Sequence, residues 1–125
     1  MSHKRILFVE DDREVRVTLM QILVEEGYAV DGASNGREAL DALRSGDRPC
    51  VILLDLMMPI MNGWQFSAAQ RKDPSLAEIP VVIISAATNV LQSAAAMGAA
   101  AFLRKPFAIQ DLLSIVDRCC GEPAQ

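Results

Sequence analysis

The fold is decided by a short apolar stretch, Val51-Ile52-Leu53-Leu54, which is followed directly by the acidic residue Asp55. No polar residue alternates with the apolar ones, which is typical of a parallel strand that helices cover on both faces. Similar runs recur along the chain at Ile6-Leu7-Phe8-Val9, at the weaker Ala29-Val30, at Val81-Val82-Ile83-Ile84 and at Ala100-Ala101-Phe102-Leu103. We therefore predict five strands.

Amphipathic stretches lie between these runs. Val15, Leu19, Ile22 and Leu23 recur at helical spacing, and Gly27 is expected to end that first helix. Asn35 with Glu38 resembles a capping box and opens a second helix, and further helices are expected at about 63–72, 89–97 and 109–120. Five strands alternating with five helices predict an α/β fold, a three-layer doubly wound parallel sheet with right-handed crossovers.

Composition narrows the class of protein. The chain has 125 residues, of which 51% are hydrophobic, and a formal net charge of -4. This length predicts one domain, and the acidic balance argues against nucleic acid as a partner. The longest apolar stretch, Ala94 to Leu103, is too short to span a membrane. Cys50, Cys119 and Cys120 fit no disulfide framework, so we expect a reducing, cytoplasmic location.

Polar residues follow four of the predicted strands. Glu10, Asp11 and Asp12 follow the first, Asp55 the third, Ser85 the fourth, and Arg104 with Lys105 the fifth. Ligands of open parallel sheets bind beyond the carboxyl ends of the strands, so these groups are expected to share one pocket. Clustered carboxylates suit Mg²⁺, and a carboxylate nucleophile such as Asp55 can form an aspartyl phosphate.

Four motifs together resemble the receiver domain of bacterial response regulators. They are Val9-Glu10-Asp11-Asp12, Leu53-Leu54-Asp55-Leu56-Met57-Met58-Pro59 with Asn62-Gly63, Ile84-Ser85-Ala86, and Lys105-Pro106-Phe107. The resemblance implies a flavodoxin-like (βα)5 fold with strand order 2-1-3-4-5. It also implies a receiver domain over residues 4–120, with short tails at 1–3 and 121–125.

The resemblance implies a role for each acidic residue. Asp55 corresponds to the phosphoacceptor. Asp11, Asp55 and the main-chain carbonyl of Met57 correspond to ligands of Mg²⁺, for which Mn²⁺ is an acceptable substitute, and Glu10 would act through water. Asp12 occupies a position that need not contact the metal, and we expect it to cap the first helix instead.

Other matching residues correspond to the groups that respond to the phosphoryl group. Lys105 would pair with its oxygens, and the bond from Lys105 to Pro106 is often cis in this family. Ser85 corresponds to the hydroxyl that moves toward the phosphoryl group, and Phe102 to the aromatic switch that turns inward behind it. Ser85 as the start of a turn and Phe102 as a plain core residue are the simpler alternatives.

The sequence departs from the family at two places. Met57 and Ala87 occupy positions that tune self-dephosphorylation, and because both are apolar we expect a long-lived phosphoryl group. The segment 86–98, which carries the predicted fourth helix, is short and nearly uncharged. We therefore do not expect the dimer that typical receiver domains form across this helix.

The resulting hypothesis is a phosphorylation-dependent signalling switch of a two-component phosphorelay, and not an enzyme in the usual sense. A sensor histidine kinase or a histidine phosphotransfer protein would be the donor. The chain is expected to be a stand-alone receiver or a receiver cut from a longer protein. Its output would be contact with a downstream protein, without nucleic acid or membrane. The alternatives are an aspartyl-phosphate phosphohydrolase, which would want an acid where Met57 stands, a flavin-binding domain, and a phosphorylation-independent interaction module.

Overall fold

The computed structural model of the chain describes residues 4–86 and 90–121. Within these residues, five strands alternate with five helices, as predicted. The strands are β1 (Arg5–Val9), β2 (Ala29–Ala33), β3 (Val51–Asp55), β4 (Val81–Ser85) and β5 (Ala101–Arg104). The helices are α1 (Arg13–Glu25), α2 (Gly36–Ser45), α3 (Gly63–Lys72), α4 (Val90–Ala96) and α5 (Ile109–Cys120). The predicted start of the fourth helix near Asn89 lies outside the described residues.

The strands form one parallel sheet in the order β2-β1-β3-β4-β5. This order confirms the flavodoxin-like arrangement that the family resemblance implied. In the register of the sheet, Asp55 of β3 lies opposite Ile84, and Ser85 of β4 lies opposite Arg104. The carboxyl ends of the central strands therefore meet at one edge of the sheet.

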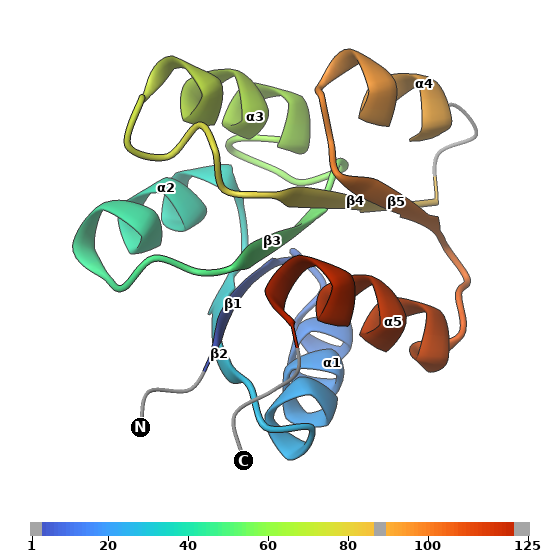
Figure 1. The fold of residues 1–125 in the computed structure, drawn as a ribbon. Helices are drawn as coiled ribbons and strands as arrows, with labels where there is room; N and C mark the ends of the chain where they lie inside the picture. Colours follow the sequence, from blue (N-terminus) through green and yellow to red (C-terminus); the bar gives the residue numbers. More distant parts are fainter. Residues whose placement is uncertain (1–3, 87–89, 122–125) are drawn as a thin grey trace.

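Alternate residues of β3 enter two different hydrophobic cores. Ile52 and Leu54 pack with residues of α2, α3 and α4, whereas Val51 and Leu53 pack with residues of α1 and α5. Figure 1 shows the corresponding layers, with α2, α3 and α4 on one face of the sheet and α1 and α5 on the other. Burial on both faces explains why this strand carries no polar residue before Asp55.

Side-chain caps fix where α1, α2 and α3 begin. Asp12 caps α1 as expected, because its carboxylate accepts hydrogen bonds from the backbone N–H groups of Glu14 and Val15. Asn35 caps α2, but the carboxylate of Glu38 accepts from the N–H of Ser34, one residue before the cap, so the predicted box is displaced. A reciprocal capping box forms instead at the start of α3, between Asn62 and Gln65.

The expectation of no disulfide is wrong. Cys50, just before β3, is joined to Cys120, the last residue of α5, and Cys119 is a free thiol. The two bonded residues are 70 positions apart, so only the packing of α5 on the sheet brings them together. Among the described residues, no helix combines the length and apolar character that crossing a membrane requires.

Candidate functional site

Two hydrogen bonds to the backbone of Glu10 position the acidic turn after β1. The N–H of Glu10 donates to the carbonyl of Ala33 at the end of β2, at 2.9 Å. The guanidinium of Arg16, one turn into α1, donates to the carbonyl of Glu10 at 2.7 Å. The first two acids after β1 are thus held over the sheet edge. Sequence reasoning missed Arg16, because nothing in its spacing shows that its target is a backbone carbonyl.

Asp55 ends β3 with its side chain buried at 8% exposure. One carboxylate oxygen accepts a hydrogen bond from the N–H of Met57 at 3.2 Å. The chain then turns sharply, since the N–H of Gly63 donates back to the carbonyl of Leu56 at 2.9 Å. A Cβ atom on Gly63 would lie 2.7 Å from the Cα atom of Leu56, so this close approach requires glycine.

Three carboxylates converge at this edge, as the sequence predicts. One oxygen from each of Glu10, Asp11 and Asp55 can be chosen so that all three lie within 4.8 Å of one another. Glu10 and Asp55 are buried, whereas Asp11 is exposed. Clustered oxygens that face solvent on one side suit a hard divalent cation, which keeps several of its waters. Glu10, Asp11 and Asp55 could therefore hold such an ion.

Lys105 bridges the two buried acids. Its ammonium nitrogen lies 2.9 Å from a carboxylate oxygen of Glu10 and 3.3 Å from one of Asp55. Its backbone N–H donates to the carbonyl of Ser85 at 2.9 Å, which ties the β5–α5 loop to the end of β4. The peptide bond between Lys105 and Pro106 is cis, as the resemblance suggests. The ammonium of Lys105 therefore lies in the same pocket as the carboxylates, as the sequence predicts.

Burial and charge shift the pKa values of this pair. Burial raises the pKa of Glu10 above its ordinary value, and the charge of Asp55 adds to the rise, while the hydrogen bond from Lys105 opposes it. Burial alone would lower the pKa of Lys105. The hydrogen bond to Glu10 and the charges of Asp55 and Glu10 outweigh burial, so the pKa of Lys105 is raised. The ammonium is thus the form that this site stabilises.

The remaining predicted site residues differ in exposure. Ser85 is fully buried at the end of β4, next in the sheet to the strand that carries Asp55. Phe102 of β5 is 39% exposed, so its ring is not enclosed in the core. Met57 is 62% exposed beside the acidic cluster. Ala87 lies outside the described residues.

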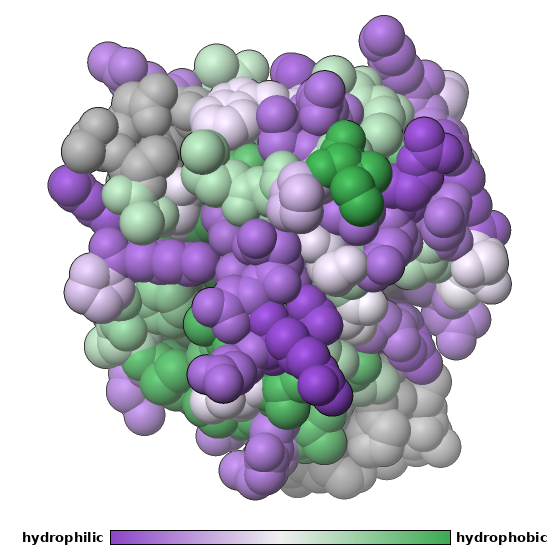
Figure 2. All heavy atoms as spheres, turned by 180° about the vertical axis from the view of Figure 1, so that it is seen from behind, coloured by the Kyte–Doolittle hydropathy of each residue, from purple (hydrophilic) through white to green (hydrophobic). Residues whose placement is uncertain are grey.

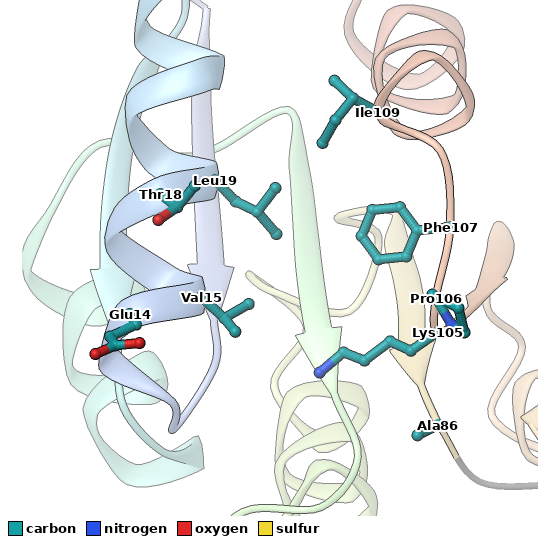
Figure 3. A pocket seen from close by; sticks show the side chains of 9 residues that line it. All are labelled: Glu14, Val15, Thr18, Leu19, Ala86, Lys105, Pro106, Phe107 and Ile109. Atoms are coloured by element: carbon teal, nitrogen blue, oxygen red, sulfur yellow. The ribbon is translucent and has the colours of Figure 1, made fainter.

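An apolar pocket of about 660 Å³ opens beside Lys105. Figure 3 shows Val15 and Leu19 of α1 on one side and Phe107 and Ile109 on the other, with the extended Lys105 side chain reaching the end of β3. Figure 2, the view from behind Figure 1, shows hydrophobic side chains reaching the surface between polar ones. Among the described residues, Glu14 is the only one that contributes a carboxylate to the lining.

Comparison with known proteins identifies the family. A family model described as the response regulator receiver domain matches residues 6–117, so the chain belongs to the receiver domains of response regulators. Response regulator MprA of Mycolicibacterium vanbaalenii is 40% identical over 112 residues, which are 88% of this chain and 47% of that protein. MprA of Mycobacterium tuberculosis is 39% identical over the same length. The chain thus spans about half the length of the curated relatives it matches.

Solved structures agree with this assignment. Chemotaxis response regulator CheY4 of Vibrio cholerae superposes with a TM-score of 0.85 at 32% identity, covering 94% of this chain and 99% of that one. Response regulator TrrA of Thermotoga maritima, solved in complex with Mg²⁺-BeF, superposes with a TM-score of 0.82 at 30% identity, covering 93% and 98% of the two chains.

Proposed function

We propose that this receiver domain is a phosphorylation-dependent switch of a two-component phosphorelay, in which Asp55 accepts a phosphoryl group from a phosphohistidine. One observation carries the proposal. Asp55 ends the central strand, with Lys105 3.3 Å from one of its carboxylate oxygens and the carboxylates of Glu10 and Asp11 close by. This arrangement combines a nucleophile, a cation and an acidic cluster within one pocket.

In the proposed transfer, a carboxylate oxygen of Asp55 attacks the phosphorus atom of the phosphohistidine. The new P–O bond replaces the P–N bond, whose electron pair returns to the imidazole of the donor, which then takes a proton from solvent. The ammonium of Lys105 already contacts Asp55, so it needs only a small movement to reach a phosphoryl oxygen. The chain itself acts as acceptor and slow self-phosphatase, not as a multiple-turnover enzyme.

The acidic cluster fits a divalent cation by the chemistry of its donors. We assign Asp11, Asp55 and the main-chain carbonyl of Met57 as direct ligands of Mg²⁺ or Mn²⁺, with Glu10 acting through water. A bound cation would neutralise charge on the transferring group. TrrA, which has the same fold, was solved in complex with Mg²⁺-BeF, and this supports a divalent cation in a receiver domain of this kind.

The readout of phosphorylation would pass from Lys105 and Ser85 to Phe102. The hydroxyl of Ser85 would donate to a phosphoryl oxygen, and the ring of Phe102, now 39% exposed, would turn inward. The inward state would bury apolar surface without needing a partner for a phenolic hydroxyl. Phosphorylation would thus bias two existing states rather than create a new one.

The partners follow from this chemistry. The donor would be a sensor histidine kinase or a histidine phosphotransfer protein in the cytoplasm. The apolar pocket between α1 and the β5–α5 loop opens beside Lys105, on a side from which a donor's apolar side chains could approach Asp55. The exposed, apolar Met57 cannot orient an attacking water, which favours a long-lived phosphoryl group and disfavours a phosphohydrolase.

Incubation with acetyl phosphate, followed by intact mass, tests the proposal. With Mg²⁺ present, the native chain should gain the mass of one phosphoryl group, and chelation of Mg²⁺ should prevent the gain. Asp55→Ala should abolish it, whereas Asp31→Ala, which changes an exposed aspartate of β2, should not. No gain on the folded native chain, or an undiminished gain in Asp55→Ala, would refute the proposal.

A further inference from the structure

The disulfide lies at the opposite edge of the sheet from the acidic site. Cys50 precedes β3, and its backbone N–H donates to the carbonyl of Arg5 in β1 at 2.8 Å. Cys120 ends α5, and its carbonyl accepts a hydrogen bond from the ammonium of Lys4. The Cα atoms of the two cysteines are 5.2 Å apart, a normal separation for a disulfide. Figure 1 shows this end of α5 against the start of β3.

The same two parts of the chain are thus joined twice. At one edge of the sheet, the Cys50–Cys120 bond links the start of β3 to the end of α5. At the other edge, the ion pair of Lys105 and Asp55 links the end of β3 to the loop that leads into α5. Between these links, Leu112 and Val116 of α5 pack in the same core as Leu53 of β3. The covalent link therefore restrains α5 on the strand that carries Asp55.

We propose that Cys50 and Cys120 form a reversible disulfide, so that the redox state of the surroundings controls how firmly α5 is held to β3. Disulfides are rare in reducing compartments, where a bond of this kind forms only when an oxidant is present. A hydrogen bond would stabilise the reduced state, because the sulfur of Cys50 lies 3.2 Å from the carbonyl oxygen of Arg5, which would accept from the thiol. Neither state requires a phosphoryl group on Asp55.

A low-molecular-weight disulfide would serve as oxidant. Cys50 is half-buried and Cys120 is buried, so the thiolate of Cys50 is the more accessible nucleophile. It attacks the small disulfide, forms a mixed disulfide and releases one small thiolate. The thiolate of Cys120 then attacks the sulfur of Cys50 and releases the second small thiolate. The two cysteines lose two electrons and two protons, and the oxidant becomes two thiols.

Cys119 provides the matched control. It neighbours Cys120 in sequence but is outside the bond. Burial raises the pKa of the Cys119 thiol, which keeps it protonated and slow to exchange near neutral pH. The bond should therefore remain between Cys50 and Cys120 when Cys119 is replaced.

A redox titration of the full chain tests the proposal. The protein is equilibrated over a range of reduced and oxidised glutathione, its free thiols are alkylated, and the intact mass and melting temperature are measured. Three alkylated thiols are expected at the reducing end and one at the oxidising end. Because the bond closes a long loop, the melting temperature should fall by roughly 10 °C on reduction. Cys119→Ser should keep this response, and Cys50→Ser and Cys120→Ser should abolish it.

Several outcomes would overturn the proposal. Three alkylated thiols at every ratio would show that the bond does not form, and a bond that survives the most reducing ratio would show a permanent crosslink. Loss of the response in Cys119→Ser would show that Cys119 takes part in the bond, contrary to the proposal. An equal melting temperature in the reduced and oxidised proteins would show that the bond does not restrain α5. Unfolding of the reduced native chain would leave no folded second state, so it would overturn the switch even if the serine variants failed to fold.

Discussion

Replacing Lys105 by methionine should destabilise the fold through charge rather than packing. Methionine keeps most of the apolar stem but leaves Glu10 and Asp55 without their shared cation, with side chains only 3% and 8% exposed. One oxygen of each carboxylate lies within 4.8 Å of the other. Two unit charges at that separation repel by about 3.5 kcal/mol at an effective dielectric constant of about 20. Removing one partner of a buried ion pair costs about 3–5 kcal/mol, and the 26% exposure of Lys105 favours the lower end. We expect a loss of about 3 kcal/mol at pH 7 without divalent cations.

The loss should depend on pH in a definite direction. The pKa of Glu10 is raised in the folded state, so folding favours the protonated carboxyl. The stability that this group contributes is therefore lost as the pH rises from 4.5, the ordinary pKa of Glu10, through its pKa in the folded state. Without Lys105, the pKa of Glu10 should rise further, and the loss should extend to higher pH. The difference between the two proteins should therefore shrink to about 1 kcal/mol or less near pH 4, where Glu10 is protonated.

Urea unfolding at pH 4 and pH 7, with and without Mg²⁺, measures this difference. Added Mg²⁺ should restore part of the stability of the variant at pH 7, because the cation supplies the missing positive charge. Lys72→Met, at the exposed end of α3, is the control and should change the unfolding free energy by less than about 0.5 kcal/mol. An equal loss at both pH values would refute the electrostatic reasoning and point to packing of the lysine stem.

Three further substitutions test local features. Gln70→Leu should lower the unfolding free energy, measured in urea, by about 2–4 kcal/mol. The buried amide of Gln70 donates to the carbonyls of Leu76 and Ile79, and both carbonyls would lose their donor. A change below about 0.5 kcal/mol would contradict this prediction. Gly63→Ala should lower the unfolding free energy by about 1–3 kcal/mol and slow phosphorylation, because the new Cβ would lie 2.8 Å from the carbonyl oxygen of Asp55. Normal phosphorylation kinetics would contradict this prediction, because they would show that the turn accommodates the Cβ without displacing Asp55. Asp12→Ala should cost about 1 kcal/mol through loss of the α1 cap while Mg²⁺ binding, followed by Trp64 fluorescence, persists; loss of binding would make Asp12 a ligand.

The sequence predicted the strands best where burial is complete. β3 and β4 are buried on both faces, so the first four residues of each form an unbroken apolar run. The edge strand β2 is partly exposed, and its run was correspondingly short, with Asp31 and Gly32 following Ala29-Val30. The order of the strands came from the family resemblance, because runs of this kind do not specify which strands are neighbours.

The sequence predicted which residues form the candidate site but not the contacts between their side chains. Strand ends placed Glu10, Asp55 and Lys105 at one edge, because parallel strands share a direction. The bridge that Lys105 makes between the two buried acids depends on the loop after β5, which spacing alone does not describe. The Cys50–Cys120 bond was missed for a related reason: the contact arises from the docking of α5, over 70 positions of chain.

The most direct test of the central claim is chemical identification of the residue that carries the phosphoryl group. Borohydride reduces an aspartyl phosphate to homoserine, so peptide mapping after treatment with acetyl phosphate and Mg²⁺ reports the modified position. Our account predicts homoserine at position 55 and unmodified aspartate at positions 11 and 12. Homoserine at another position, or none in the folded chain, would contradict the assignment of Asp55 as the phosphoacceptor.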